Sequence, residues 1–297
     1  MRLCPPPLAA GATVAVVAPC SPFRPENLER GVEWLRSHGY QVQHRPDITA
    51  GWRYLAGDDQ RRANELEAAL LDPSVDAVIC ARGGYGASRL LPRLGKLKPP
   101  DQPKWFVGFS DVTMLHLWLG QSWHWVTVHG PMVGTTFAGD GFDTETAGSL
   151  FEALQGRPRP VAGRMVVEGE ARGVLVGGNL SLLAHSVGTP WQADFQDAIV
   201  LLEDIGEAPY RIDRMLTQLL LAGLFDQARG IVLGQWTDCD PPEKADFTVE
   251  DVLLERLGGL GIPVMAGVPV GHEAHNVAVP LGSQARITSG RLSFDQR

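Results

Sequence analysis

A short apolar segment that ends in a serine and passes directly into a helical pattern constrains this chain most. Residues 105–108, Trp-Phe-Val-Gly, have the composition of a buried strand, and helically spaced apolar residues follow Ser110 and Asp111. A serine at a sharp strand-to-helix corner exposes its hydroxyl. The N–H of the next residue faces the same space, where the helix N-terminus favours negative charge. The segment therefore fits either an acyl-transfer nucleophile or a serine that only caps the helix.

The segments before this corner alternate between strand and helix patterns. One helix is predicted to begin at Pro25 and to stop at Gly39, and another to be capped by Asp58 or Asp59. Short apolar or β-branched runs predict strands at Thr13–Ala18, around Val42 and at Ala77–Cys80. Strands separated by helices imply a parallel sheet with right-handed crossovers. Residues 1–160 are therefore predicted to form a Rossmann-like α/β domain that carries the serine corner.

A polar, proline-rich stretch at Gly156–Pro160 is the best candidate for a linker. Beyond it, an amphipathic helix is predicted at Ile212–Leu224, and Ser289-Gly290 separates two short runs that predict a hairpin. Further strands are predicted from apolar runs at Val174–Val176, Ile199–Leu202, Ile231–Leu233 and Val264–Val268. Residues 161–297 are therefore predicted to form a second domain, mixed α/β and rich in strands.

The composition excludes several classes of partner. The net charge of −8 and the lack of basic clusters argue against nucleic acid and against an anionic membrane as partners. The four cysteines form no Cys-x-x-Cys pair, which fits buried thiols in a reducing compartment better than disulfides or a zinc site. The first residues lack the apolar core of a signal peptide, and no apolar run approaches the length of a membrane span. We therefore expect a cytoplasmic protein.

Two further motifs lie at predicted strand ends. Residues 82–86, Arg-Gly-Gly-Tyr-Gly, follow a buried strand, where glycines let backbone N–H groups approach a ligand closely. Their spacing matches neither a dinucleotide fingerprint nor a phosphate-binding P-loop, which leaves a tight turn or an oxyanion-binding strand end. Glu203 and Asp204 close an apolar strand. Either both are solvated acids at the end of a strand, or one of them orients a histidine.

Several histidines and one asparagine complete the set of candidates. His272 and His275 lie in a loop-like segment without His-Glu-x-x-His spacing, so a zinc site is weakly supported. His272 is either a solvated loop histidine or a mobile general base. His116, on the helix after the serine corner, and His129, in a predicted turn, are interpreted as structural. Asn179 precedes a helical run and fits the position of an N-cap.

Taken together and in this order, these motifs closely resemble the L,D-carboxypeptidase family of serine peptidases, which includes murein tetrapeptide carboxypeptidases. The matches run from about residue 15 to residue 282, so the resemblance covers nearly the whole chain. The matching motifs are Ala18-Pro19, residues 82–86, Gly108-Phe109-Ser110-Asp111, His129-Gly130-Pro131, Gly177-Gly178-Asn179-Leu180, Leu202-Glu203-Asp204 with Tyr210, Arg211 and Asp213, and Gly271-His272 with Asn276.

The resemblance implies a Ser-Glu-His triad that needs neither a metal nor a cofactor. Ser110 would be the nucleophile, and His272 would be the general base and then the general acid. Glu203 would orient the imidazole, and Asp204, which faces the opposite side of the strand, would not. The family also implies an oxyanion hole formed by the backbone N–H groups of Gly84 and Asp111.

The resemblance also implies a substrate. It places Asn179 at the substrate-side wall, where we expect it to bind substrate. We also expect Arg82 and Gly83 to contact substrate, because N–H donors and guanidinium groups recognise carboxylates well. The expected activity is the release of terminal D-alanine from an L-centre of a peptidoglycan-derived tetrapeptide during recycling, by a homodimer. One alternative is the related peptidase that cleaves microcin-type peptidyl-nucleotides, which the short segment after Pro190-Trp191 disfavours. The other alternative is a non-catalytic ligand-binding α/β protein.

Overall fold

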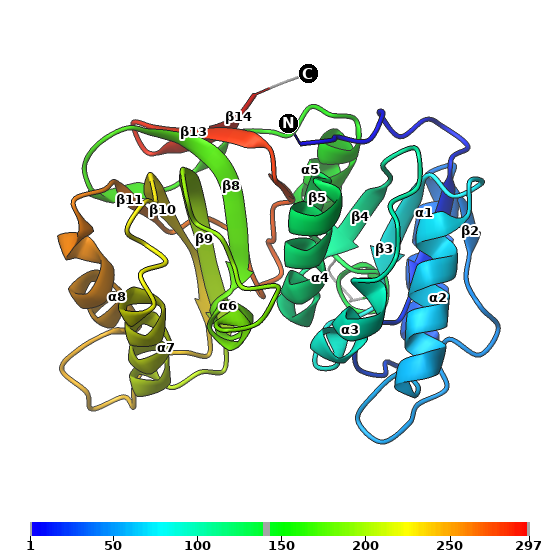
Figure 1. Cartoon of the computed structure of the whole chain (residues 1–297), viewed down its shortest axis with the longest axis horizontal. Coiled ribbons are helices and arrows are strands. Elements are labelled where there is room, and N and C mark those ends of the chain that lie inside the picture. Colours follow the sequence, from blue (N-terminus) through cyan, green and yellow to red (C-terminus); the bar gives the residue numbers. More distant parts are fainter. Residues whose placement is uncertain (1, 139–142, 296–297) are drawn as a thin grey trace.

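The computed structural model describes residues 2–138 and 143–295 of the chain. Two sheets lie side by side, one in each half of the molecule, and helices cover both of them (Figure 1). The first sheet is mostly parallel, and the second combines parallel and antiparallel strands. The predicted fold class is therefore confirmed: a Rossmann-like α/β sheet comes first, and a mixed α/β part rich in strands follows.

The first sheet has the strand order β12-β5-β4-β3-β1-β2. Its strands are β1 (Thr13–Val17), β2 (Gln41–Gln43), β3 (Ala77–Cys80), β4 (Trp105–Gly108), β5 (Thr127–His129) and β12 (Val279–Leu281). The first five are parallel, and β12 is antiparallel to β5. The parallel order 2-1-3-4-5 is a common doubly wound order, in which ligands bind beyond the carboxyl ends of β1 and β3.

Side chains of successive strand residues alternate between the two faces of this sheet. Val14 and Val16 pack in one core with helices α1 and α5, whereas Ala15 and Val17 pack in another with α2, α3 and α4. The bounds of these helices are α1 (Pro25–Ser37), α2 (Asp59–Leu71), α3 (Leu91–Leu94), α4 (Thr113–Trp118) and α5 (Thr144–Leu154). As predicted, Asp58 caps α2 and Gly39 follows α1 with a positive φ.

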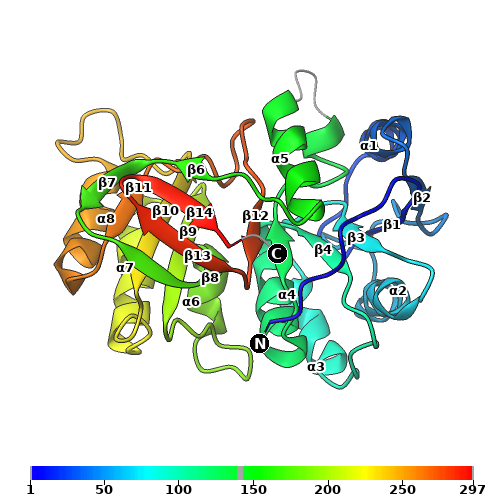
Figure 2. The ribbon, with the colours of Figure 1, turned by 90° about the horizontal axis from the view of Figure 1, so that it is seen from above.

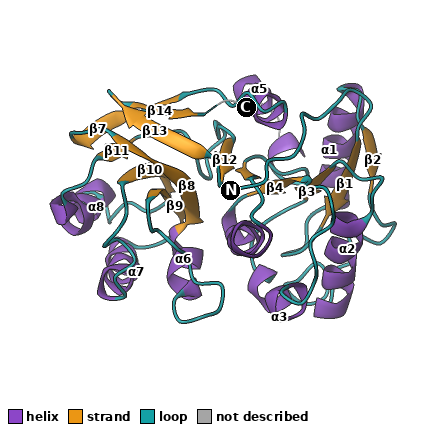
Figure 3. Ribbon diagram, turned by 45° about the horizontal axis from the view of Figure 1, so that its top comes forward, coloured by secondary structure: helices purple, strands orange, loops and turns teal. Residues whose placement is uncertain are grey.

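The second sheet has the order β6-β14-β13-β8-β9-β10-β11-β7. Its strands are β6 (Val161–Ala162), β7 (Arg164–Val167), β8 (Ala171–Asn179), β9 (Ala198–Ile205), β10 (Gly230–Thr237), β11 (Val264–Ala266), β13 (Gln284–Thr288) and β14 (Arg291–Phe294). Helices α6 (Leu180–Ser186), α7 (Pro209–Leu221) and α8 (Val249–Leu257) cover one side of the sheet (Figure 3). The hairpin predicted around Ser289-Gly290 is confirmed as β13 and β14.

The structure differs from the sequence predictions at three places. His129 was predicted in a turn, which is wrong: it is the last residue of β5, a buried strand that Gly130-Pro131, a pair typical of turns, follows directly. The helix after the serine corner is not continuous, because a 3₁₀ turn at Ser110–Val112 precedes α4 and a π-helical turn at Leu119–Trp123 follows it. Strand β12 belongs by sequence to the second half but lies between the two halves and joins the first sheet (Figure 2).

Among the helices of the described residues, none combines the length and the apolar character needed to cross a membrane.

Candidate active site

Ser110 stands at a strained corner between β4 and the 3₁₀ turn that leads into α4. Its φ of 64° lies in the left-handed region, which costs a residue with a side chain about 1–2 kcal/mol. Glycines on both sides make room for this conformation. A Cβ on Gly108 would lie 2.8 Å from Cγ1 of Val112, and a Cβ on Gly83 would lie 2.8 Å from Cβ of Ser110. Main-chain geometry therefore holds the hydroxyl at the end of the sheet.

Ser110 lines an open cleft that both halves of the chain build. Arg82, Gly83 and Gly84 contribute from the loop after β3, and His272 contributes from the loop after β11. The remaining lining residues include Phe109, Thr135, Asp143, Ile205 and Glu273. Most of these positions follow the carboxyl ends of strands, where open α/β sheets bind their ligands. The nucleophile and base candidates therefore face one space.

His272 is held by a buried carboxylate. Its Nδ1 donates to Oε2 of Glu203 at 2.7 Å, and the Glu203 side chain is completely buried. Burial raises the pKa of Glu203, and the bond from His272 opposes that shift. The ring of Phe109 packs edge-to-face on the imidazole, with 4.9 Å between centroids. This arrangement leaves Nε2 of His272 free to act as a base.

The bond between base and nucleophile is not formed. Nε2 of His272 is buried and has no hydrogen-bond partner among the described residues. Ser110 and His272 therefore line the same cleft but are not hydrogen-bonded to each other. In enzymes, such bonds are often long before substrate binds and tighten in the complex. The structure thus brings Glu203 to His272 and places Ser110 beside them.

Neighbouring side chains fix the loop that carries His272. Oδ1 of Asn276 accepts from the N–H of Gly271 at 3.1 Å. The amide of Gln235, on β10, accepts from the N–H of Glu273 at 3.0 Å and donates to the carbonyl of His275 at 2.7 Å. Sequence reasoning missed Gln235, because nothing within β10 distinguishes a glutamine that crosses to another loop.

The two loop histidines have different partners. Nδ1 of His275 bonds to Oδ2 of Asp143 at 2.5 Å, and this bond is the main reason that the pKa of Asp143 falls to about 2. Asp143 also caps α5 by accepting from the N–H groups of Glu145 and Thr146. In the described parts of the chain, no three His, Cys, Asp or Glu side chains are grouped to hold a metal ion. His272 and His275 therefore belong to separate contacts.

Asp204 and Asn179 lie behind the cleft wall. Asp204 is buried and accepts from Nδ2 of Asn179 at 2.8 Å and from the N–H and the hydroxyl of Ser181. Oδ1 of Asn179 accepts from the N–H of Leu182, so Asn179 is the N-cap of α6. It is 3% exposed and is not among the described residues that line the cleft. Asp204 therefore fastens a helix, whereas Glu203 meets the imidazole.

The two oxyanion-hole candidates, Gly84 and Asp111, follow strands β3 and β4. The carboxylate of Asp111 turns inward, where it is 2% exposed and accepts from the N–H of Ala87 at 2.8 Å. Ser21, in the loop after β1, contacts the loop after β3: it donates its N–H to the carbonyl of Gly83, and its hydroxyl accepts from the N–H of Tyr85. No main-chain hydrogen bond between described residues uses the N–H of Gly84 or Asp111. Both donors remain free for a ligand.

The two histidines interpreted as structural are buried. Nε2 of His116 bonds to the carbonyl of Gly108 at 2.8 Å, and Nδ1 bonds to Oγ1 of Thr127 at 2.8 Å. Burial lowers the pKa of His116 to about 4, so its ring is neutral at pH 7. Burial also lowers the pKa of His129, whose ring packs against Phe109. His116 thus ties the end of β4, just before the nucleophile, to β5.

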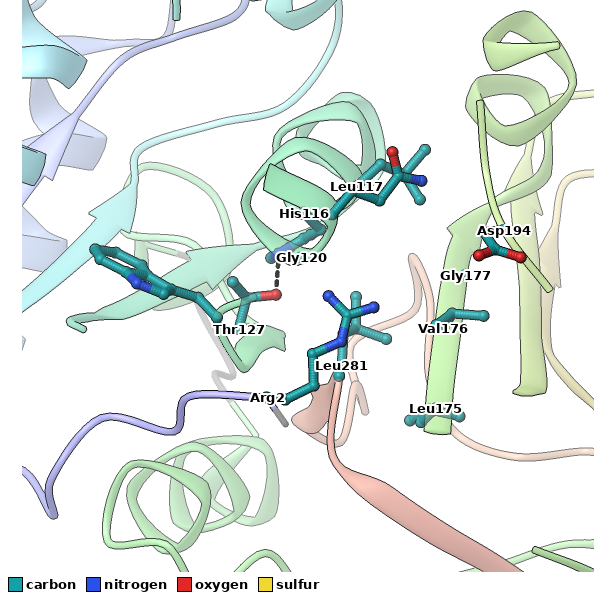
Figure 4. A pocket seen from close by; sticks show the side chains of 13 residues that line it. Arg2, His116, Leu117, Gly120, Thr127, Leu175, Val176, Gly177, Asp194 and Leu281 are labelled. Carbon is teal, nitrogen blue, oxygen red and sulfur yellow. Dashed lines mark hydrogen bonds between the residues drawn. The ribbon is translucent and has the colours of Figure 1, made fainter. Parts of the chain in front are cut away.

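A second cavity lies on the other side of His116, between the two halves of the chain (Figure 4). Arg2 reaches toward it from the N-terminal arm, and Asp194 stands on the wall formed by the second half. Neither Ser110 nor His272 is among its described lining residues. The reactive groups therefore belong to the open cleft and not to this cavity.

Comparison with known proteins identifies the family. The model of the LD-carboxypeptidase N-terminal domain matches residues 14–130, and that of the C-terminal domain matches residues 172–287. The chain is 42% identical over 295 residues to a putative carboxypeptidase of Synechocystis, covering 98% of this chain and 96% of the relative. It is 33% identical over 297 residues to the murein tetrapeptide carboxypeptidase of Pseudomonas aeruginosa, covering 95% and 94%.

Solved structures agree with this comparison. Muramoyltetrapeptide carboxypeptidase from Oxalobacter formigenes superimposes with a TM-score of 0.83 at 31% identity, covering 95% of this chain and 98% of that one. The microcin C7 self-immunity protein MccF superimposes with a TM-score of 0.87, covering 99% of this chain and 98% of that one, but at 22% identity this likeness shows the fold alone. The chain belongs to the LD-carboxypeptidase family.

Proposed function

We propose that this protein is a serine-type L,D-carboxypeptidase whose triad is Ser110, His272 and Glu203. The observation that carries the proposal is the geometry of the cleft. A serine in a strained strand-to-helix corner shares the cleft with an imidazole whose far nitrogen is bound by a buried carboxylate. A serine hydroxyl needs a base of this kind, and the base needs a fixed tautomer.

The proposed reaction begins when Oγ of Ser110 attacks the carbonyl carbon of the scissile amide. Nε2 of His272 takes the hydroxyl proton, and the imidazolium formed is stabilised by Glu203. The carbonyl oxygen becomes an oxyanion, which the N–H groups of Gly84 and Asp111 bind; one such donor is typically worth about 3–4 kcal/mol. Collapse of the intermediate breaks the C–N bond, and His272 returns the proton to the departing amine. Water then hydrolyses the acyl-enzyme by the same steps.

The proposed substrate is a murein tetrapeptide, from which the enzyme releases terminal D-alanine attached to an L-residue. The family and the names of the relatives support this choice. Arg82 and Gly83 line the cleft, and we assign them to substrate contact. The Arg82 guanidinium bonds to the carbonyl of Pro22 at 2.6 Å and keeps further donors for a carboxylate. Asn179, which is buried, would support the substrate-side wall through Asp204.

The proposal extends to the biological setting and to the domains. We place the enzyme in the cytoplasm, in the recycling of peptidoglycan fragments, as a homodimer that uses neither metal nor cofactor. We also propose that residues 1–160 form the nucleophile domain and that residues 161–297 carry Glu203 and His272. Sedimentation of the purified protein tests the dimer, and activity after incubation with a strong chelator tests the independence from metal.

One assay tests the substrate and separates the alternatives. A tetrapeptide ending in D-alanine is incubated beside the same peptide ending in L-alanine and beside its C-terminal amide, with products read by mass spectrometry. We expect cleavage of the first peptide only, because the free carboxylate positions the scissile carbonyl. Equal cleavage of all three would indicate a general peptidase. Cleavage of none, with hydrolysis of a peptidyl-nucleotide, would favour the microcin-type peptidase, and no hydrolysis at all would favour a binding protein.

A further inference from the structure

A fully buried arginine lies behind the cleft, on a helix that contributes no residue to the described cleft lining. Arg62 belongs to α2, and 0% of its surface is exposed. A buried guanidinium is costly unless its donors are satisfied, so the partners of Arg62 indicate what its burial achieves. We propose that Arg62 is a positioning residue that fixes the oxyanion-binding loop over Ser110. This inference rests on the proposed function.

The guanidinium of Arg62 joins three loops. Nη1 donates to the carbonyl of Gly86 at 2.9 Å and also to the carbonyl of Pro19, and Nε donates to the carbonyl of Gly57 at 3.0 Å. Nη2 pairs with Oδ1 of Asp59 at 2.5 Å. These carbonyls come from the loop after β3, the loop after β1 and the segment before α2. Because the donors of a guanidinium form a rigid planar fork, one side chain sets the relative positions of all three segments.

The loop after β3 is shaped around this contact at one end and around the nucleophile at the other. Gly86 has a φ of 129°, and a Cβ there would lie 2.6 Å from Nη1 of Arg62. Gly83, three residues earlier, would bring a Cβ to 3.1 Å from the hydroxyl oxygen of Ser110. The oxyanion donor Gly84 lies between these two fixed points. We therefore expect a shift at Gly86 to change the position of the N–H of Gly84 relative to Ser110.

The positive charge of Arg62 also favours a second contact at the same end. The buried carboxylate of Asp111 accepts from the N–H of Ala87, the residue after Gly86. Burial raises the pKa of Asp111, and the positive charge of Arg62 acts in the opposite direction. Arg62 therefore helps to keep Asp111 ionised as an acceptor. The same arginine thus supports both proposed oxyanion donors, since Asp111 supplies the second N–H.

The neighbouring Arg61 provides a matched control. It is on the same helix and also donates to two main-chain carbonyls, those of Asp47 and Ala56. Both acceptors lie before α2, and within the described parts of the chain no hydrogen bond joins Arg61 to the loop after β3. A purely structural role for such arginines would make Arg61→Met and Arg62→Met similar in their effects. If Arg62 is a positioning residue, Arg62→Met should lower catalysis and Arg61→Met should not.

The experiment measures how fast a fluorophosphonate probe labels Ser110 in the whole protein, because this reaction needs the nucleophile and the oxyanion hole but not the natural substrate. For folded protein, we expect Arg62→Met to lower the second-order labelling rate about 10- to 100-fold and Arg61→Met to leave it within about twofold. With the tetrapeptide, Arg62→Met should lower kcat by a similar factor and leave KM within about threefold. The pH profile of kcat/KM should keep its midpoint, because His272 and Glu203 are untouched.

The outcomes distinguish this inference from the proposed function. Wild-type protein that is neither labelled at Ser110 nor active on peptides would overturn both. Normal labelling of the wild type, with Arg62→Met labelled equally fast or Arg61→Met slowed equally, would overturn the role of Arg62 alone. If Arg62→Met does not fold, Arg62→Lys replaces it, since lysine keeps the charge but cannot reach every acceptor in one plane. If the probe then labelled Ser110 of the Arg62→Lys variant at the wild-type rate, the inference would be overturned.

Discussion

The nucleophile corner, residues 108–112, and the base loop, residues 270–276, meet in one cleft but are held in different ways. In the corner, every residue of the preceding strand is buried, and the main chain itself takes the strained conformation that presents Ser110. In the base loop, side chains from other strands supply the support: Glu203 from β9 and Gln235 from β10. One half of the site is built by local backbone geometry, and the other is assembled by contacts distant in sequence.

This difference determines how each region should respond to substitution. In the corner, the reactive atom is the one feature that a change can remove while the main chain keeps its course. In the base loop, several hydrogen bonds share the task of holding His272, so the loss of one of them should have a graded effect. Substitutions in the two regions should therefore differ in the size and the pattern of their effects.

The largest effect is expected at Ser110. The substitution Ser110→Ala removes the nucleophile but little core packing, so stability should change little while turnover falls at least about a thousandfold. Alanine and serine both carry a Cβ, so the left-handed φ costs both residues a similar free energy, and the substitution should not add backbone strain. The measurement is kcat on the tetrapeptide together with the midpoint of thermal unfolding. Turnover above about a tenth of wild type in a folded variant would contradict the assignment.

The next largest effect is expected at Glu203, and it is compared with the effect at the adjacent acid of β9, Asp204. We expect Glu203→Gln to lower kcat about a hundredfold or more, because an amide can present the wrong group to Nδ1 of His272 and no longer stabilises the imidazolium. Asp204→Asn should mainly lower stability, because Asp204 accepts from Asn179 and Ser181 at the start of α6. Kinetics and urea unfolding of both variants measure this. A larger loss of kcat in Asp204→Asn would reverse the assignment.

The same contrast explains what could be predicted from sequence. The corner was predictable because strand, glycine, serine and helix follow one another within about ten residues, and each has a local preference. The cap of α2 and the hairpin around Ser289-Gly290 were predictable for the same reason. By contrast, Glu203 and His272 were paired only through the resemblance to a family, because 69 residues separate them.

Elements without a local pattern could not be predicted. Strand β5 is followed directly by Gly130-Pro131, and β12 contains Pro280, and these residues favour turns, so His129 was placed in a turn and β12 was not assigned to the first sheet. The roles of the Gln235 and Arg62 side chains could not be predicted from a local pattern either. Each occupies an ordinary position on its element, and its importance comes from loops that only the tertiary fold brings close.

A third prediction concerns the corner and its pH dependence. Burial lowers the pKa of His116 to about 4 from the ordinary 6.5, so between these values the unfolded chain binds a proton that the folded chain does not. The contribution of this group to stability is therefore complete above pH 6.5 and declines as the pH falls toward 4. The loss should reach about 3 kcal/mol. The His116→Gln variant should lack this loss. Urea unfolding at pH 7 and at pH 4 should therefore show that the fall in pH lowers the stability of the wild type more than that of the variant. Parallel pH curves would contradict this account.

The smallest effect is expected at the outer end of the base loop. His275 bonds to Asp143 at the start of α5, and this bond joins the base loop to the first half of the chain. The pair is partly exposed, and such pairs contribute about 0–1 kcal/mol. Because the bonds from Gln235 and Asn276 remain, His275→Ala should lower kcat only a few-fold, by no more than about fivefold. KM should change little, and the label on Ser110 should form at nearly the wild-type rate.

The control for this last prediction is His44→Ala, which removes another exposed histidine, whose Nδ1 bonds to the carbonyl of the next residue, Arg45. It should leave kcat unchanged. Asp143→Asn separates the two tasks of the aspartate, since asparagine can still cap α5 but no longer carries the charge that faces His275. It should resemble His275→Ala in kcat and in stability. If either variant at this pair abolished activity as Ser110→Ala does, support of the base loop would depend on one bond, and the contrast between the two regions would fail.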